Sequence, residues 1–131
     1  MWILTPIGFF SIVSKPGDAQ AGTLTVRARV RGDLEALGRD VLPGLGEIRE
    51  SRDTDYRFRA TAPRAEVAAA MARMVEGLDY GNFKSEVARR QGHARSDLYH
   101  DAWSVLHRLQ VDPAFAGKGR GPGSTPRGGT R

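Results

Sequence analysis

The chain has 131 residues and no cysteine, with 20 lysine and arginine residues against 15 aspartate and glutamate residues. This length is typical of one domain with one modest core. The lack of cysteine excludes a disulfide framework, a thiolate zinc site and a cysteine nucleophile. The apolar start at residues 1–4 is short and is broken by Thr5-Pro6. We therefore expect neither a signal peptide nor a membrane helix, and we expect a cytoplasmic location.

The formal net charge of +5 invites a nucleic-acid interpretation, so its distribution along the chain matters. Residues 112–131 carry four basic side chains and one acidic side chain, which gives +3. Residues 1–111 carry 16 basic and 14 acidic side chains, which gives only +2. Nucleic-acid binding by the folded part therefore has to come from local clustering of basic side chains.

The composition also predicts the domain organisation. Residues 117–131 consist of glycine, proline, small polar and basic residues, without a large apolar side chain. Such a segment has no apolar surface whose burial could offset the entropy that its glycines lose on folding. We expect a single domain over residues 1–111 and a disordered Gly/Pro/Arg tail over residues 112–131.

Two strands are the first predicted elements. Residues 7–15 are rich in β-branched and aromatic types, and the run ends at a turn over residues 16–18. Residues 24–31 alternate between apolar and polar positions, which is typical of a half-buried strand with a solvent face. The apolar set is Leu24, Val26, Ala28 and Val30, and the polar set is Thr25, Arg27, Arg29 and Arg31.

The middle of the chain predicts a helix, two strands and a second helix. Asp33 is a suitable N-cap for a helix that Pro43-Gly44 ends. Residues 47–50 are a weak strand candidate, and residues 56–60 alternate as a further strand. Pro63 suits the first turn of the next helix.

Two more helices are predicted near the end of the domain. A short helix covers residues 82–90, and a longer helix covers residues 94–109. The longer helix has apolar residues at helical spacing, which we expect it to bury. They are Leu98, Ala102, Val105, Leu106 and Leu109.

This element order predicts an α+β fold, with an antiparallel sheet and helices on one face. The order is ββαββα, followed by C-terminal helices. Moving the first strand to the end of that order gives βαββαβ. We therefore also expect a permuted ferredoxin-like arrangement of the strands.

Five arginines on two predicted strands form the first candidate site, for nucleic acid. Alternate residues of a strand lie about 6.6–6.8 Å apart, close to the phosphate spacing of an extended single strand. Guanidinium groups suit phosphate oxygens. Either Phe9 with Val13 or Phe10 with Ile12 also faces outward and offers a surface on which a base could stack. The five arginines are Arg27, Arg29, Arg31, Arg57 and Arg59.

The alternative for this face is a solvated surface without a ligand. Four acidic residues close in sequence could neutralise the arginines. They are Glu47, Glu50, Asp53 and Asp55.

Residues 78–95 form a second candidate site, an elbow between helices. Polar, basic and aromatic side chains are dense there and could hold RNA or an acidic protein. The alternative is a helix–helix joint whose polar groups cap the helix ends. The candidate residues are Tyr80, Asn82, Lys84, Arg90, Gln91, His93 and Arg95.

A third pattern is the trio His93, Asp97 and His100, at i, i+4 and i+7. Two imidazoles and a carboxylate on one side of a helix could hold a metal or move protons. This side lies opposite the apolar positions of the same helix, which favours a solvated face. We find no second ligand cluster and no His-Glu-x-x-His motif, and so we assign no metal, cofactor or catalytic residue.

Four segments together resemble a family of small uncharacterised bacterial proteins. They are residues 8–13 (GFFSIV), 15–18 (KPGD), 24–30 (LTVRARV) and 80–93 (YGNFKSEVARRQGH). The resemblance covers about residues 1–110 and leaves out the Gly/Pro/Arg tail. It implies one folded unit over that range and no particular catalytic or binding residue.

Three functions follow as hypotheses. The first is a noncatalytic module that binds RNA or another single-stranded nucleic acid through the arginine face, with the basic tail as an electrostatic arm. The second is a protein-interaction or regulatory subunit without catalytic activity. The third is an enzyme that uses a metal at His93, Asp97 and His100. The sequence favours a noncatalytic protein and does not indicate an oligomeric state.

Overall fold

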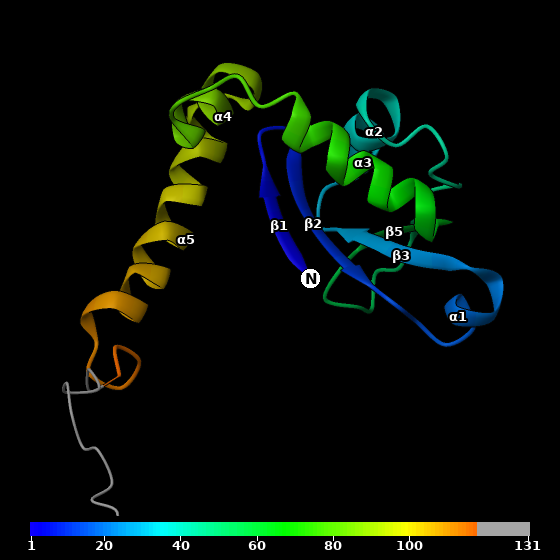
Figure 1. Ribbon diagram of the computed structural model, residues 1–131, viewed down its shortest axis with the longest axis horizontal. Helices are drawn as coiled ribbons and strands as arrows, with labels where there is room; N and C mark the ends of the chain where they lie inside the picture. The colour runs from blue at the N-terminus through cyan, green and yellow to red at the C-terminus, as the bar shows by residue number, and fades with distance from the viewer. Residues whose placement is uncertain (118–131) are drawn as a thin grey trace, which may run out of the picture.

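One antiparallel sheet of five strands forms the centre of the protein, and the computed structural model describes residues 1–117 (Figure 1). The strand order across the sheet is β1-β2-β3-β5-β4, and each neighbouring pair is antiparallel. The strands are β1 (Trp2–Thr5), β2 (Gly8–Val13), β3 (Thr23–Ala28), β4 (Arg49–Glu50) and β5 (Phe58–Pro63). The predicted α+β class with an antiparallel sheet is confirmed.

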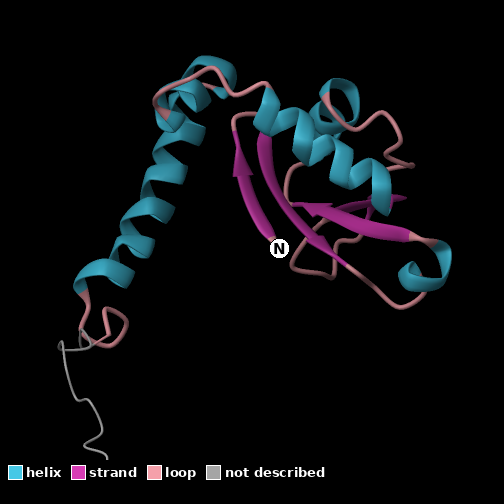
Figure 2. Cartoon of the chain, in the orientation of Figure 1, coloured by secondary structure: helices cyan, strands magenta, loops and turns pink. Residues whose placement is uncertain are grey.

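Two of the five helices, α2 and α3, cover one face of the sheet (Figure 2). The helices α4 and α5 lead away from the sheet, and α5 projects as an arm (Figure 1). The helices are α1 (Asp18–Ala21), α2 (Arg31–Asp40), α3 (Arg64–Glu76), α4 (Phe83–Gln91) and α5 (His93–Val111). Within residues 1–117, no helix is both long enough and apolar enough to cross a bilayer.

The core lies between the sheet and the helices α2 and α3. Alternate residues of each strand face it, so the period-two pattern of the sequence decides which side chains are buried. From the sheet it contains Phe10, Ile12, Val26, Ala28 and Ala62. The helical side contributes Leu34, Leu37, Leu42, Val67 and Ala70.

The N-terminal strand β1 was not expected from the sequence. It pairs with β2 as a hairpin, with Trp2 opposite Ser11 and Thr5 opposite Gly8. The Thr5 hydroxyl holds the turn, since its Oγ1 accepts from the Gly8 amide at 3.1 Å and donates to the Gly8 carbonyl at 2.9 Å. This side-chain turn explains why Pro6 does not separate the first residues from the sheet.

The strand predicted over residues 24–31 is shorter in the structure. Strand β3 ends at Ala28, and α2 begins at Arg31 with Val30 as its N-cap residue. The prediction of Asp33 as the N-cap is therefore wrong. The Asp33 carboxylate lies in the first turn of α2 and instead accepts from the Phe9 amide at 3.0 Å and from Arg95.

The apolar side of α5 is exposed, so the prediction that this helix buries it is wrong. Leu98, Val105 and Leu109 are 61%, 62% and 56% exposed. They are exposed because α5 extends away from the sheet and contacts α4 only near its own first turns. Residues 118–131 of the predicted tail lie outside the described residues.

Candidate nucleic-acid interface

Three arginines face one another across neighbouring strands on the sheet face opposite α2 and α3. In the strand register, Arg27 of β3 lies opposite Arg59 of β5, and Arg59 lies opposite Arg49 of β4. Directly opposed side chains share a face, and like charges placed in this way repel each other. Within residues 1–117, none of the three forms an ion pair with a carboxylate. The row is therefore a concentration of positive charge whose repulsion an anion would relieve.

Aromatic side chains extend this face on the β1 and β2 side. Phe9 lies on the open face, whereas Phe10 is fully buried beneath α2 and α3, which settles the alternative left by the sequence. Trp2, on β1, is 70% exposed and meets Phe9 edge to face at 6.0 Å between ring centroids. The Arg29 guanidinium lies 6.0 Å from the Phe9 ring. An exposed indole beside arginines can stack an unpaired base.

The loop over residues 51–57 folds onto the centre of the open face and places Tyr56 there. The Tyr56 ring is 2% exposed and lies 4.5 Å from the Arg27 guanidinium and 4.8 Å from that of Arg29. The strand predicted over residues 56–60 would place Tyr56 on the same side as Phe58 and Ala60. This prediction is wrong, because β5 begins only at Phe58 and Tyr56 belongs to the loop.

The arginines hold this loop through its backbone. Arg29 Nε donates to the Asp55 carbonyl at 3.2 Å, and Arg59 donates to the Tyr56 carbonyl at 3.3 Å. Arg27 donates to the Ser11 hydroxyl at 2.7 Å. These bonds go to neutral groups, so they fix the positions of the guanidiniums while leaving their charge uncompensated.

Buried polar atoms in the same cluster lack hydrogen-bond partners. Within the described part of the chain, these atoms are Arg27 Nε, Arg59 Nε and the Tyr56 hydroxyl. A buried donor without a partner costs free energy, and natural proteins keep few of them. The cluster therefore contains three unsatisfied polar atoms beneath its surface, in addition to uncompensated charge.

A hollow of about 270 Å³ lies on the same face, beside the row of arginines. Its basic side chains outnumber its single acidic one, so it suits an anionic group such as a phosphate. Its polar lining comes from Lys15, Thr25, Glu47, Arg49, Arg59 and Thr61.

The five predicted arginines do not all belong to this cluster. Arg27, Arg29 and Arg59 surround Tyr56. Arg31 is the first residue of α2 and pairs with Glu35 at 3.0 Å. Arg57 pairs with Glu50 at 2.7 Å, so one of the four suspected acidic residues does neutralise an arginine.

Sequence reasoning missed Trp2 and Arg49 as members of this face. Arg49 lies in the weakly predicted strand at residues 47–50, and the register of that strand would have placed it beside Arg59. Trp2 required the β1–β2 hairpin, whose signal was hidden by Pro6.

The predicted elbow is a packed joint between α4 and α5. Asn82 caps α4 by accepting from the Ser85 amide at 2.9 Å. Tyr80 packs on Phe83, and Phe83 stacks on Tyr99 of α5 at 5.8 Å. Lys84 Nζ lies 2.9 Å from His100 Nδ1. These contacts are those expected of a structural helix–helix joint.

Two of the remaining elbow residues, Gln91 and Arg95, attach this joint to the rest of the fold. Gln91 donates to the Pro6 carbonyl at 2.6 Å, and Arg95 forms an ion pair with Asp33 at 2.8 Å. Arg90 pairs with the buried Glu86. His93 is the exposed first residue of α5.

Glu86 is the most strongly perturbed acid in the joint. Hydrogen bonds from Arg89, and then from Arg90, lower the pKa of the Glu86 carboxyl from 4.5 to about 2. Glu86 is therefore ionised at neutral pH and binds both arginines, and its single negative charge offsets one of their two positive charges.

Two of the three histidines of α5, His100 and His107, stack on one aromatic ring. Trp103 stacks between His100 and His107, at 5.5 and 5.2 Å between ring centroids. Among residues 1–117, no three histidine or acidic side chains lie close enough to hold a metal ion. His93, Asp97 and His100 are thus not brought together as a metal site in the described part of the chain.

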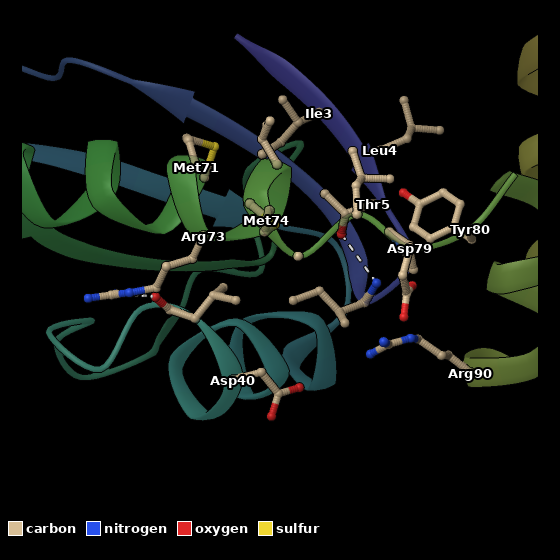
Figure 3. A pocket seen from close by; sticks show the side chains of 16 residues that line it. Ile3, Leu4, Thr5, Asp40, Met71, Arg73, Met74, Asp79, Tyr80 and Arg90 are labelled. Atoms are coloured by element: carbon tan, nitrogen blue, oxygen red, sulfur yellow. Dashed lines mark hydrogen bonds between the residues drawn. The ribbon is translucent and has the colours of Figure 1, made fainter.

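A larger groove of about 470 Å³ lies on another side of the molecule, between β1, α3 and the segment that follows α3. Figure 3 shows Met71 and Arg73 at one end of it and Asp79 and Arg90 at the other. Its floor is mainly apolar, and Arg73 is already bonded to the Val41 carbonyl at 2.8 Å. This groove suits an apolar group better than a phosphate.

Comparisons with known proteins yield no relative, since no family model, curated protein or solved structure matches the chain. The family resemblance in the sequence therefore remains an expectation.

Proposed function

We propose that this protein is a noncatalytic module that binds RNA or another single-stranded nucleic acid through the open face of its sheet. The observation that carries the proposal is the row Arg27, Arg59 and Arg49, in which like charges oppose each other without a carboxylate partner in the described residues. A phosphate backbone laid along this row would compensate its positive charge. The proposal keeps the cytoplasmic location expected from the sequence.

Base stacking is the second part of this proposal. Trp2 and Phe9 lie on the same face as the arginines, with Trp2 largely exposed. Aromatic stacking is tolerant of base identity, because every base has a π face. We therefore expect affinity for single strands with little sequence preference.

The test is a fluorescence-anisotropy titration of the full chain with a labelled single-stranded oligonucleotide at low salt. Arg29→Glu should weaken binding roughly tenfold or more, since it reverses one charge of the cluster. Arg29 is exposed, and so the variant is expected to fold. Arg39→Glu is the matched control, because it makes the same charge change at an exposed position of α2, the helix on the other face.

Two results would contradict the proposal. If Arg39→Glu weakens binding as much as Arg29→Glu, the affinity reflects total charge and has no site on the sheet. If a chain ending at Gly117 loses all binding while Arg29→Glu retains it, the basic tail is the binding element.

The alternative is a protein-interaction or regulatory subunit, and the exposed apolar side of α5 favours it. Recovery of a complex that resists salt and contains no nucleic acid would select this function over the first. An acidic protein partner would instead bind the arginine face with strong salt dependence and compete with the oligonucleotide.

We further propose that the fold is a permuted ferredoxin-like arrangement with one additional strand. The order β2-β3-β5-β4, with antiparallel neighbours, supports this. Along the chain, moving β2 behind α3 turns the order β2-β3-α2-β4-β5-α3 into βαββαβ, the order expected from the sequence. An experimental structure with a different strand order would contradict it.

A further inference from the structure

The projecting part of α5 carries an apolar stripe that no other part of residues 1–117 covers. Four positions at spacings of four, three and four residues form it, within an arc of about 60° at 100° per residue. This is the heptad pattern of a helix that packs against another helix. The stripe consists of Leu98, Ala102, Val105 and Leu109, with Leu106 on its flank.

The half of α5 that carries most of this stripe has little else to hold it. Its contacts with α4 end at Trp103, whose ring lies 5.2 Å from Lys84 Nζ. Figure 1 shows the rest of the helix leading away from the sheet. Isolated helices of fewer than about 12–15 residues are marginal in water. A helix at this position is best explained by a partner that packs on the stripe.

The composition of residues 118–131 offers no apolar segment for this purpose. Residues 118–131 contain no leucine, isoleucine, valine, methionine or aromatic residue. Residues 118–131 therefore cannot fill the stripe with apolar side chains, which favours an occupant from another molecule.

We propose that the occupant is a second copy of this chain, whose α5 packs antiparallel on the first about a two-fold axis. The antiparallel register that uses the whole stripe places Leu98 of each chain against Leu109 of the other, and Ala102 against Val105. Small Ala102 allows the helix axes to approach closely at the centre. The same patch serves both chains, so the assembly closes as a dimer.

Charges beside the stripe favour this orientation. Asp101 and Arg108 lie seven residues apart on the same flank of α5. In the antiparallel register, each Asp101 meets Arg108 of the other chain, and two ion pairs form. In a parallel pair, Asp101 would lie near Leu106 instead. Within residues 1–117, Arg108 pairs with Asp112 at 3.3 Å and its guanidinium lies 5.9 Å from the Phe115 ring centroid. Both contacts are at the surface, and a new partner can replace them.

The competing arrangement is insertion of α5 into the apolar groove of another copy. That groove has Val75 and Leu78 at its rim, and both are exposed. Its charged lining residues, Asp40, Arg73, Asp79 and Arg90, come from four separate segments and do not repeat the seven-residue spacing of Asp101 and Arg108 on one helix. The test below separates the two arrangements.

The first experiment is sedimentation of the full chain over a wide range of concentrations. We expect a reversible shift from 14.3 kDa to twice that mass as concentration rises. Val105→Asp should abolish the shift, whereas Gln110→Asp, with the same charge change off the stripe and away from the flank of Asp101 and Arg108, should leave it intact. Both positions are exposed in the single chain, so neither variant is expected to unfold it.

Charge exchange tests the orientation. Asp101→Arg alone should weaken the dimer about tenfold, because it replaces two ion pairs by two repulsions. Adding Arg108→Asp to the same chain should restore the dimer, since the pairs re-form with their signs exchanged.

Because the chain has no cysteine, introduced thiols give a further test. In the antiparallel register, a mixture of Leu98→Cys and Leu109→Cys chains forms a disulfide-linked pair on oxidation. Neither variant links to itself, because identical positions lie about 16 Å apart along the axis.

Three outcomes would overturn the proposal. They are a monomer at every concentration, self-linking of Leu98→Cys alone, and loss of the dimer in Val75→Asp together with insensitivity to Asp101→Arg. The last outcome would assign the stripe to the groove. None of these results depends on nucleic-acid binding, since the sheet face and α5 are separate surfaces.

Discussion

Asp33 and Arg95, which are 62 positions apart in the chain, form a two-pronged ion pair between α2 and α5. Arg95 donates to Asp33 Oδ2 at 2.8 Å and to Oδ1 at 3.1 Å. The same carboxylate accepts from the Phe9 amide at 3.0 Å. Both side chains are largely buried, Asp33 at 6% and Arg95 at 18% exposure. One residue therefore ties the sheet, α2 and the base of the projecting helix together.

Removing one partner of this pair should destabilise the protein strongly. Arg95→Met leaves the Asp33 carboxylate buried without its counter-charge, a change that typically costs about 3–5 kcal/mol. Arg31→Met is the control, because it breaks the exposed pair with Glu35 and should have a far smaller effect. Urea unfolding of both variants measures the difference. Equal losses would show that the buried pair has no special role.

Close packing at Gly8 should make that position intolerant of a side chain. A β-carbon added there would lie 2.7 Å from Cβ and Cγ of Asp33, which Arg95 holds in place. Gly8→Ala should therefore lower the free energy of unfolding by about 1–3 kcal/mol. At Gly81, an added β-carbon meets nothing within 4 Å, so Gly81→Ala is the matched control. A Gly8→Ala variant as stable as this control would contradict the prediction.

Protonation of Glu86 should loosen the joint between α4 and α5. Arg89 and Arg90 hold the pKa of Glu86 at about 2 in the folded protein, below the ordinary 4.5. A lowered pKa stabilises the fold above pH 4.5, and this contribution is lost as the pH falls towards about 2. Wild type should therefore melt at a higher temperature than Glu86→Gln at neutral pH, and the gap should close through that window. A gap that is constant with pH would refute this.

Salt dependence should separate the two parts of the proposed nucleic-acid face. For single strands, the logarithm of affinity falls with the logarithm of salt concentration by about 0.7 per phosphate contact. Arg29→Glu should lower both the affinity and this slope. Trp2→Ala removes stacking worth about 1–3 kcal/mol and should lower the affinity while leaving the slope unchanged. If the slope falls equally in both variants, Trp2 acts by positioning the arginines rather than by stacking.

Local patterns of the sequence predicted much of the fold. Alternation over residues 24–31 identified β3, and helical spacing identified α2, α3, α4 and α5 to within a few residues. The same alternation placed Arg27 and Arg59 outward, away from the core. These features depend on near neighbours in the chain, so a single sequence contains the information to find them.

The candidate site was predicted only in part, because its geometry depends on contacts between distant segments. Arg31 and Arg57 do not belong to the cluster, because they pair with Glu35 and Glu50. Tyr56 lies on the open face, where its ring contacts Arg27. Arg49 and Trp2 lie on that face because β4 pairs with β5 and β1 pairs with β2, and no local pattern specifies these pairings.

The sequence alone determined the surplus of basic residues, which is a matter of composition. It also determined the alternation and the helical spacing, because both depend only on positions close together in the chain. Tertiary structure decided which arginines share a face and whether the apolar side of α5 is covered. The Asp33–Arg95 pair holds the base of α5 at the sheet. The rest of the helix extends away from it (Figure 1), so an amphipathic pattern that predicts burial in the core instead leaves a stripe exposed on the projecting helix.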